Sequence, residues 1–301
     1  MALPPLYKFL SVEGAKLTLS NNTFRHAKPS DFNDIEDLTV QSIFPEETEV
    51  ALKRLENGFT DVILAHLNDP PTCKSPMREQ VAMIQQVYRT NPDAANIVKA
   101  QLAKENRKAI FDVEQARSLA KKHLKEINEH MQGMRVLCVT TDKDSGRMWD
   151  EYARQHKGIA LRIEPNIAKD SKFQRFQPVT YRKTRPPLYD DTFEFIAGGL
   201  FGNLEISARA IIEKIIYSKT LKWQHESEYR LAIPLGKDEA PYDVLKYHPE
   251  EITEIYLGLA MGKADKDDIL AKAKALNPNI RMFQAERDAK GRITFDHDGV
   301  V

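Results

Sequence analysis

The strongest constraint on the fold is a change in the spacing of apolar residues along the chain. Within residues 46–132, apolar side chains recur every three or four positions, which is the period of an amphipathic α-helix. On both sides of this block, short apolar runs and alternating patterns are typical of β-strands. This order predicts an α+β fold with a mixed, mostly antiparallel sheet domain and an inserted helical subdomain. We expect residues 1–45 and 133–301 to form the sheet domain and residues 46–132 to form the insertion.

Several strands are predicted on either side of the helical block. The apolar run Arg135–Thr141 has the length of a strand, and we expect it to be central and buried. The segment Lys16–Ala27 is predicted as a strand that follows a first strand at Leu6–Leu10. Further strands are expected at 159–163, 179–181, 228–235, 242–247 and 252–257, and a hairpin at 281–286 and 292–296.

Proline and glycine mark several helix ends. Ser75-Pro76 and Asn91-Pro92 each place a capping side chain before a proline, which predicts helix starts near residues 76 and 92. The second of these helices is expected to be long and to end at Gly133. Other helices are predicted at 148–156 and 265–276. Residues 190–218 are also predicted to be helical, with interruptions at Gly198-Gly199 and Gly202.

The composition excludes several classes of protein. Forty-four basic residues balance 44 acidic ones, so the whole chain has no excess charge for nonspecific binding to nucleic acid or an anionic membrane. The two cysteines, Cys73 and Cys138, provide no disulfide framework and favour a reducing compartment. The N-terminus lacks a secretion signal, and no stretch reaches about 18 apolar residues. We therefore expect a cytoplasmic globular protein that does not span a membrane.

The densest set of reactive side chains lies in Lys219–Leu235. From Glu226 onward, charged and apolar residues alternate, which places Glu226, Glu228 and Arg230 on one face of a strand. A rise of roughly 3.3 Å per residue would set the two carboxylates about 6.5 Å apart, within reach of one ligand. The alternative interpretation is a solvated strand face with a weak ion pair.

A second acidic stretch follows Pro29. It contains Asp31, Asp34, Glu36 and Asp37 within one loop. These carboxylates could bind a hard cation, but their spacing lacks the glycine that a calcium loop needs for its turn. Hydrogen bonds within turns are the simpler interpretation of this stretch.

Several short motifs stand in a characteristic order. They are Tyr7-Lys8, Phe32-Asn33-Asp34 with Asp37, Met148-Trp149-x-x-Tyr152-Ala153 with His156-x-Gly158, Tyr181, and Trp223-x-x-Glu226-x-Glu228-Tyr229-Arg230. In order and spacing they resemble a widespread bacterial domain-of-unknown-function family, number 2971. The resemblance runs from residue 7 to about residue 258 and is weak across the helical block. Ile35 and Glu36 replace the family's usual Pro and Phe, and the family name implies no activity.

A looser resemblance is to ADP-ribosyltransferases of the cholera-toxin type. Those enzymes pair a cation on the first strand with a Glu-x-Glu at the mouth of a later strand, and Lys8 and Glu226-x-Glu228 occupy comparable places here. The resemblance implies an NAD-consuming ADP-ribosyltransferase or NAD glycohydrolase, of the kind that acts as a toxin or phage-defence effector. Tyr7-Lys8 departs from the usual Arg or His, and no clear Ser-Thr-Ser element is present.

Under this interpretation the two glutamates have different roles. Glu228 would stabilise the oxocarbenium-like cation that forms as nicotinamide leaves, and Glu226 would be the general base for the acceptor. The acceptor would be a protein or a nucleic acid, and a toxin of this kind is expected to have a cognate inhibitor protein. The residues expected to contact NAD are Tyr7, Lys8, Asn33, Trp149, Tyr152 and Arg230.

Two other functions stay open at this stage. The first is a noncatalytic protein- or ligand-binding module, in which Trp223 and Tyr229 belong to the core and the charged row is a structural ion-pair ladder. The second is a metal-dependent hydrolase or nuclease, for which histidine offers little support because only His156 lies within a motif. Its ligands would be Asp34, Asp37, Glu226 and Glu228.

Overall fold

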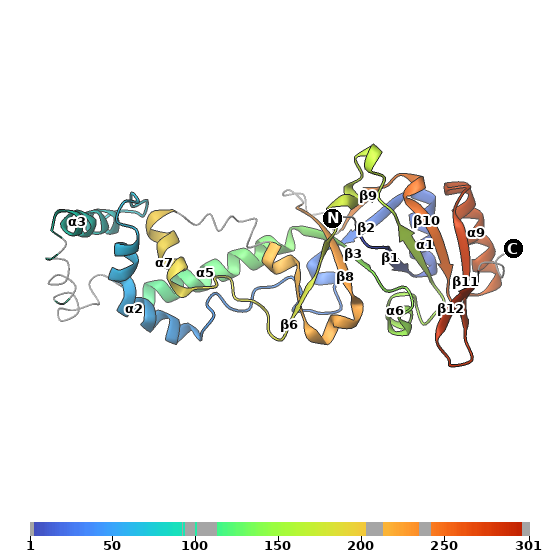
Figure 1. Cartoon of the computed structure of the whole chain (residues 1–301), viewed down its shortest axis with the longest axis horizontal. Coiled ribbons are helices and arrows are strands. Elements are labelled where there is room, and N and C mark those ends of the chain that lie inside the picture. The colour runs from blue at the N-terminus through green and yellow to red at the C-terminus, as the bar shows by residue number, and fades with distance from the viewer. Residues whose placement is uncertain are drawn as a thin grey trace. The chain divides into compact units, whose positions relative to one another are not determined.

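The chain forms two compact units in a computed structural model that describes residues 3–91, 93, 100, 113–202, 213–234 and 242–296. The first, here called the sheet unit, consists of Met1–Asp37, Gln132–Lys183 and Ile216–Val301. The second, the helical unit, consists of Leu38–Met131 and Thr184–Ile215. Figure 1 labels the elements of both units. The helical unit thus includes a second segment, after residue 183, that the sequence analysis assigned to the sheet domain.

The sheet unit contains a ten-stranded, mostly antiparallel mixed sheet, which confirms the α+β class. Its strands are β1 (Leu6–Leu10), β2 (Thr23–Ala27), β3 (Met134–Thr140), β4 (Ile159–Ile163), β5 (Gln177–Pro178), β8 (Glu228–Pro234), β9 (Tyr242–Lys246), β10 (Ile252–Leu257), β11 (Arg281–Arg287) and β12 (Ile293–Asp296). Their order is β12-β11-β10-β4-β1-β3-β2-β9, with β8 pairing β3 and β5. The short strands β6 (Thr180–Arg182) and β7 (Ser218–Thr220) form a separate parallel pair.

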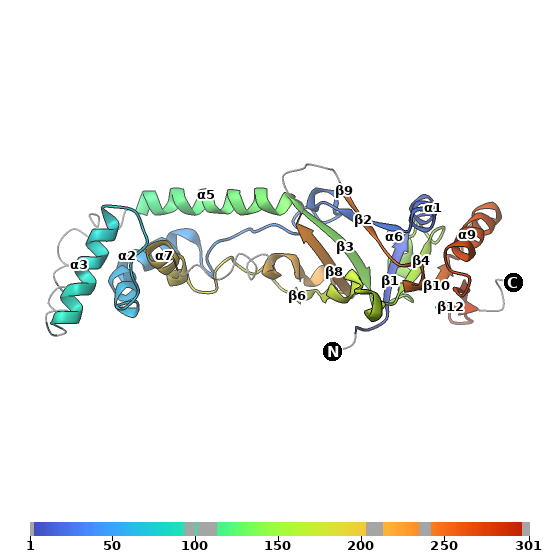
Figure 2. The same cartoon turned by 90° about the horizontal axis from the view of Figure 1, so that it is seen from above.

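The central position predicted for Arg135–Thr141 is confirmed by β3. This strand pairs along its whole length with β8 on one edge, and on the other edge it meets first β2 and then β1. Figure 2 shows β3 and β8 lying side by side. Other strands occupy both edges of β3, and all of its residues except the half-buried Cys138 are buried, as expected for a central strand.

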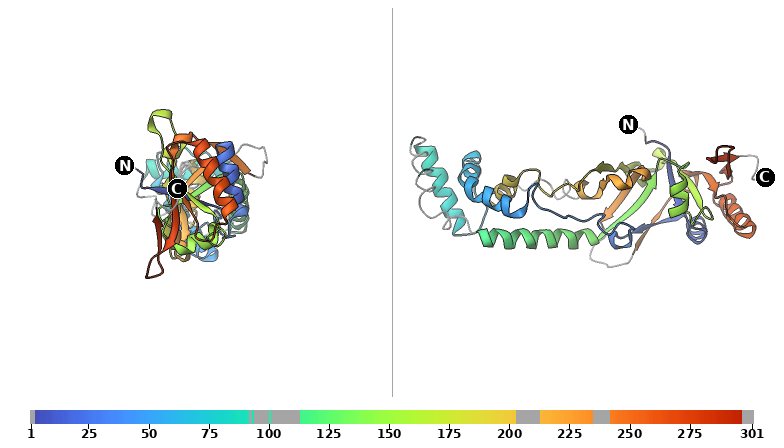
Figure 3. Two further views of the ribbon diagram at one scale, coloured as in Figure 1. Left: turned by 90° about the vertical axis from the view of Figure 1, so that its right-hand side faces the viewer. Right: turned by 90° about the horizontal axis from the view of Figure 1, so that it is seen from below.

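Helices cover both faces of the sheet. On one face α1 (Val12–Asn21) packs beside α9 (Lys263–Leu276), as the left view in Figure 3 shows. Their apolar residues join those of the strands in one core cluster, with Ala15, Leu19 and Ile269 fully or almost fully buried. A smaller cluster surrounds α6 (Gly146–Tyr152) and includes Phe9 and Trp149.

The predicted strand Lys16–Ala27 is wrong over its first part, which is helical. Ser11 caps α1 by accepting a hydrogen bond from the amide of Gly14, and Asn22 ends the helix in the left-handed conformation with φ 54°. Leu19 packs in the core at helical spacing from Ala15, so tertiary burial selects the helix over the alternating pattern. Only Thr23–Ala27 forms a strand, β2.

The predicted helix at 148–156 ends earlier, at Tyr152. Arg154, Gln155 and His156 follow with φ of 50°, 56° and 62°, so the chain makes a left-handed turn. Gly158 closes this turn, because a Cβ there would lie 2.0 Å from the carbonyl oxygen of Leu10. The turn therefore locks α6 against β1.

The helical unit contains α2 (Thr48–Ala65), α3 (Met77–Thr90), α5 (Val113–Gln132) and α7 (Thr192–Phe201). The predicted helix start near residue 76 is confirmed by α3, and α5 ends just before Gly133 as expected. The start predicted at Pro92 lies outside the described residues. Gly58 of α2 allows close packing on α7, since a Cβ there would lie 2.5 Å from the Phe193 ring.

Short 3₁₀ helices complete the described structure. They are η1 (Pro29–Asp31), η3 (Ile167–Lys169), η4 (Lys172–Arg175), η5 (Leu221–Glu226) and η6 (Pro249–Glu251). Among the residues that the structure describes, no helix has both the length and the apolar character needed to cross a membrane.

Candidate active site

A cavity of about 200 Å³ lies in the sheet unit where β3 changes its neighbour. β1 pairs with β3 at Tyr7 and Thr140, and β2 pairs with it at Ala27 and Val136. Between these two points, the ammonium of Lys8 donates a 2.8 Å hydrogen bond to the carbonyl oxygen of Cys138. The lysine thus occupies a backbone acceptor at the place where the two neighbouring strands diverge. The polar and aromatic residues in its lining include Tyr7, Lys8, Asn33, Tyr152, Lys219, Trp223, Glu226 and Glu228.

The two glutamates reach this cavity from different elements. Glu226 is the last residue of η5 and Glu228 is the first of β8, with Ser227 between them at φ 44°. The prediction that both belong to one strand is therefore wrong for Glu226. Even so, both carboxylates contact the ammonium of Lys219, with Glu228 at 3.3 Å. The turn at Ser227 brings the two side chains together more effectively than strand alternation would.

Arg230 holds the carboxylate of Glu228 in place but does not itself line the cavity. Its Nε and Nη2 donate to the two oxygens of Glu228, each at 2.9 Å. Its remaining donors bind both oxygens of Asp37, at 3.1 and 2.6 Å, and the carbonyl oxygen of Ile216 at 2.7 Å. Every N–H of this fully buried guanidinium is used, so it is held rigidly between the two acids.

The charged face that the alternation predicts is therefore buried instead of solvated. Glu226, Glu228 and Arg230 are 3%, 6% and 0% exposed. Burial of charge is tolerated because the acids Asp37, Glu226 and Glu228 lie among three cations, Lys8, Lys219 and Arg230.

The environment drives the pKa values of the two glutamates in opposite directions. Burial alone would raise the pKa of Glu228, but Arg230 and Lys219 lower it to about 2. Burial and the charge of Glu228 raise the pKa of Glu226, although Lys219 opposes this. Burial would lower the pKa of Lys219, but its acidic neighbours, Glu228 first among them, raise it above the usual range. Lys8 differs, because burial lowers its pKa.

Two tyrosines fix the glutamates in place. The hydroxyl of Tyr152 donates to Oε1 of Glu226 at 2.5 Å, and burial together with that carboxylate raises the pKa of Tyr152. The hydroxyl oxygen of Tyr181 accepts a 2.8 Å hydrogen bond from the amide of Glu228, and burial raises the pKa of Tyr181 to about 12. Both phenols therefore stay protonated near neutral pH.

Trp223 contributes an aromatic wall. The ammonium of Lys219 lies 4.8 Å from the centroid of the Trp223 ring, within the range of a cation–π interaction. The indole nitrogen is buried and has no hydrogen-bond partner among the described residues. A buried donor without a partner would gain a hydrogen bond from any polar ligand atom that reached it.

The structure brings most of the predicted site residues together. Six of them line the same cavity, namely Tyr7, Lys8, Asn33, Tyr152, Glu226 and Glu228. Trp149 lies in the core instead: it is 0% exposed, packs edge-on against Phe9 at 5.0 Å, and donates to the carbonyl oxygen of Lys143. Arg230 lies behind the wall formed by Glu228.

Sequence reasoning did not assign Lys219 to the site, although it opens the stretch that was singled out. The role of Asp37 as the second partner of Arg230 was also missed. The sequence signal that could have identified both is charge balance, because two neighbouring carboxylates that are buried require nearby cations. Using that signal requires knowing that Glu226 and Glu228 are buried, and the alternation of charged and apolar residues does not show this.

The carboxylates considered as metal ligands, Asp34, Asp37, Glu226 and Glu228, all line the cavity. Arg230 already holds both oxygens of Asp37 and of Glu228. Another group in the described part of the chain has the spacing of metal ligands, namely Glu151, His225 and Glu226.

Comparison with known families gives one match. The model of a family described as "Protein of unknown function (DUF2971)" matches residues 148–231, which include most of α6, Tyr181 and the Trp223-to-Arg230 motif. The match supports the resemblance to this family over that segment. No curated protein and no solved structure gives a significant match.

Proposed function

We propose that the cavity is the active site of an NAD-consuming enzyme that breaks the bond between nicotinamide and ribose and transfers ADP-ribose to an acceptor. The observation that carries this proposal is the meeting of Glu226 and Glu228 on Lys219, in the wall of a cavity that Tyr152 and Trp223 also line. A paired set of carboxylates beside aromatic rings is the chemistry that glycosidic bond cleavage uses.

Glu228 suits the stabilisation of positive charge at the ribose. When the bond from C1′ to the nicotinamide nitrogen breaks, nicotinamide leaves with the electron pair and C1′ becomes cationic. Arg230 divides its hydrogen bonds between Glu228 and Asp37, and Lys219 is shared between Glu226 and Glu228, so Glu228 shares each cation with another acid. Because the carboxylate is already fixed, it needs no reorganisation as the cation develops.

Glu226 suits the activation of the acceptor. An acceptor hydroxyl, amine or thiol would pass its proton to Glu226 as its heteroatom forms the new bond to C1′. Tyr152 and Lys219 orient this carboxylate through one oxygen each. When water takes the place of the acceptor, the same step yields ADP-ribose, which is the NAD glycohydrolase reaction.

The cavity matches one end of NAD. At about 200 Å³ it is smaller than the roughly 300–1,000 Å³ of pockets that enclose a drug-sized ligand. It would enclose the nicotinamide-ribose end and the adjoining phosphate, with Tyr7 and Trp223 as aromatic contacts and the adenosine end outside. Lys8 supplies a positive charge for the pyrophosphate, and Asn33 is an exposed polar group in the same lining.

The biological role follows from the acceptor. An enzyme of this kind would modify a protein or nucleic acid, or deplete NAD, in the manner of a toxin or phage-defence effector. A cognate inhibitor protein would then control it.

The test is release of nicotinamide from labelled NAD, with cell lysate as the source of acceptor. Glu228→Gln keeps the shape but removes the charge, so we expect turnover to fall roughly 100-fold to 1,000-fold while NAD affinity is retained. Glu226→Gln should lose transfer to the acceptor but keep part of the hydrolysis by water. Glu286→Gln, an exposed glutamate of β11, is the matched control and should behave as wild type.

The proposal is rejected if wild-type protein releases no more nicotinamide than Glu228→Gln. That result, together with a loss of stability in both variants, would favour the noncatalytic module, in which the buried charges serve only the fold. Circular dichroism of each variant separates loss of activity from loss of structure.

A further inference from the structure

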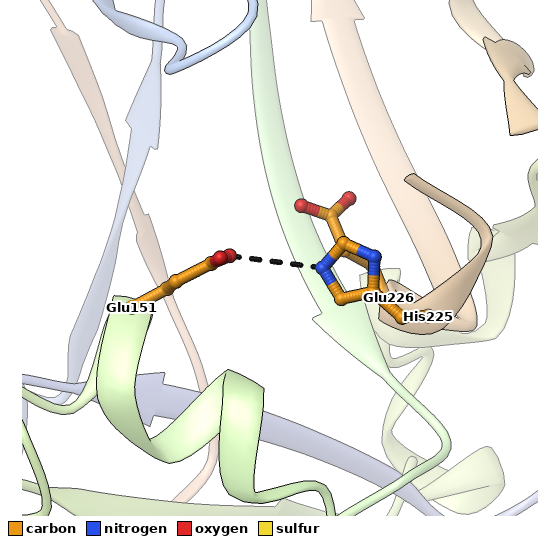
Figure 4. A group of neighbouring side chains, drawn as sticks. All are labelled: Glu151, His225 and Glu226. Carbon is orange, nitrogen blue, oxygen red and sulfur yellow. Dashed lines mark ion pairs between the residues drawn. The ribbon is translucent and has the colours of Figure 1, made fainter. Parts of the chain in front are cut away.

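We propose that Glu151, His225 and Glu226 bind a divalent transition-metal ion of the zinc class at the rim of the cavity. Glu151 belongs to α6, whereas His225 and Glu226 end η5, so two elements of the sheet unit meet here. One ligand atom from each residue lies within 4.8 Å of the other two, and Figure 4 shows the three side chains together.

The distance between His225 and Glu151 is close to that of two ligands of one metal ion. Nε2 of His225 lies 3.7 Å from Oε2 of Glu151, which is too long for a hydrogen bond. A tetrahedral zinc ion with bonds of about 2.0–2.1 Å sets neighbouring ligand atoms about 3.4 Å apart. A movement of a few tenths of an ångström would therefore let both atoms reach the same ion.

Among the residues that the structure describes, the imidazole nitrogen of His225 has no other partner. Nε2 of His225 is buried and makes no hydrogen bond to the described residues, while the side chain as a whole is 20% exposed. The ring stacks on Trp223, with centroids 6.1 Å apart and planes at 30°, which fixes its direction. An oriented imidazole nitrogen without a hydrogen bond can coordinate a metal ion through its lone pair, because no existing bond has to be broken first.

Glu226 retains the capacity to bind a metal. Tyr152 and Lys219 use one position on each of its oxygens, and a carboxylate offers about four lone-pair positions. Glu151 likewise accepts a bond from Arg147 on Oε1, while Oε2 faces His225. One nitrogen and two oxygen ligands favour zinc and similar ions over calcium or magnesium, which prefer oxygen ligands alone.

The position of the site implies regulation, and this consequence rests on the proposed function. Glu226 belongs to both the metal site and the proposed acceptor chemistry. A bound cation would lower the basicity of the Glu226 carboxylate that accepts the proton from the acceptor, so we expect metal occupancy to lower ADP-ribose transfer.

Metal binding is tested without NAD, by calorimetric titration of Zn²⁺ into the full chain and by the visible absorption of added Co²⁺. We expect one equivalent in the wild type that gives a Co²⁺ band from a nitrogen and oxygen ligand set. Glu151→Gln and His225→Ala should each weaken Zn²⁺ binding at least tenfold and reduce the Co²⁺ band. His130→Ala, at an exposed histidine of α5, is the control and should bind like wild type.

Unchanged Zn²⁺ affinity in Glu151→Gln, or no Zn²⁺ binding by wild type, would overturn the metal site. Glu151 is exposed, so its substitution carries little risk of misfolding and keeps the test decisive if His225→Ala is unstable. Because these measurements involve no NAD, an inactive protein that binds Zn²⁺ would refute the proposed function alone.

Discussion

Arg230 and Asp37 form a buried, bidentate ion pair although they lie 193 positions apart in the chain. The pair connects the end of the acidic loop to β8, and the same guanidinium positions Glu228 at the cavity. One arginine thus links the fold of the sheet unit to the geometry of its candidate active site.

Removing either partner should strongly destabilise the protein. We expect Arg230→Met or Asp37→Asn to lower the free energy of unfolding by about 3–5 kcal/mol, because either change leaves the buried charge cluster with one charge uncompensated. Urea denaturation measures the change. Arg292→Ala, which breaks an exposed pair with Asp288, should cost less than about 1 kcal/mol. If Arg230→Met and Arg292→Ala lowered the free energy of unfolding equally, the buried pair would have no special role in stability.

The two tryptophans should separate stability from ligand binding. Trp149→Ala should cost about 3–5 kcal/mol, because it empties a fully buried site and removes a hydrogen bond to Lys143. Trp223→Ala should cost less and instead weaken NAD binding. The chain has two tryptophans, so in Trp149→Phe the remaining fluorescence comes from Trp223. We expect NAD to change that fluorescence, and an unchanged signal at saturating NAD would argue against Trp223 as a contact.

His26 should make stability depend on pH. It is 0% exposed, neither ring nitrogen has a partner among the described residues, and burial lowers its pKa to about 4. Its unfolded-state pKa is about 6.5, so between these values the unfolded chain binds a proton that the folded chain does not. Stability from this residue is complete above pH 6.5 and falls by about 3 kcal/mol as the pH drops to 4.

Denaturation of the wild type and of His26→Leu across this range measures the contribution. The variant should lose less stability than the wild type between pH 6.5 and 4, since it has no ring to protonate. Parallel curves for the two proteins would show that His26 is not responsible.

Two glycines of the helical unit should respond oppositely to alanine. Gly58→Ala places a methyl group 2.5 Å from the Phe193 ring, and we expect a loss of about 1–3 kcal/mol from overpacking. Gly199→Ala in α7 meets no atom within 4 Å and should stabilise the helix by roughly 0.5–1 kcal/mol. A melting temperature that does not fall in Gly58→Ala would contradict the close packing of α2 on α7.

The sequence predicts the elements of this fold better than the environment of its charges. The apolar run around β3 has the length and composition of a buried strand, and Pro76, at the N-cap of α3, marks the start of that helix. The sequence of α1 predicts a strand because Leu17 and Leu19 alternate with polar residues, although Leu17 is 64% exposed in the helix. Helix and strand spacing overlap in such short segments, and only the cap at Ser11 distinguishes them.

For the candidate site, local spacing identified the residues but not their surroundings. Glu228 and Arg230 do share a face of β8, yet the partner that makes burial possible is Asp37, far away in the chain. Trp149 and Tyr152 stand on one short helix, and only the position of the sheet decides that the first enters the core and the second faces the cavity. Such outcomes depend on tertiary contacts that no single stretch of sequence encodes.

Lys8 introduces a competition between ligand and sheet. Its ammonium satisfies the carbonyl of Cys138 at the point where β1 and β2 separate along β3. An anion that draws the ammonium away leaves that carbonyl without its partner, whereas an anion bound alongside it preserves the bond. If an anionic ligand binds at Lys8, its affinity depends on what happens to this hydrogen bond of the central strand. Hydrogen exchange along β3, measured with and without the ligand, would distinguish the two cases.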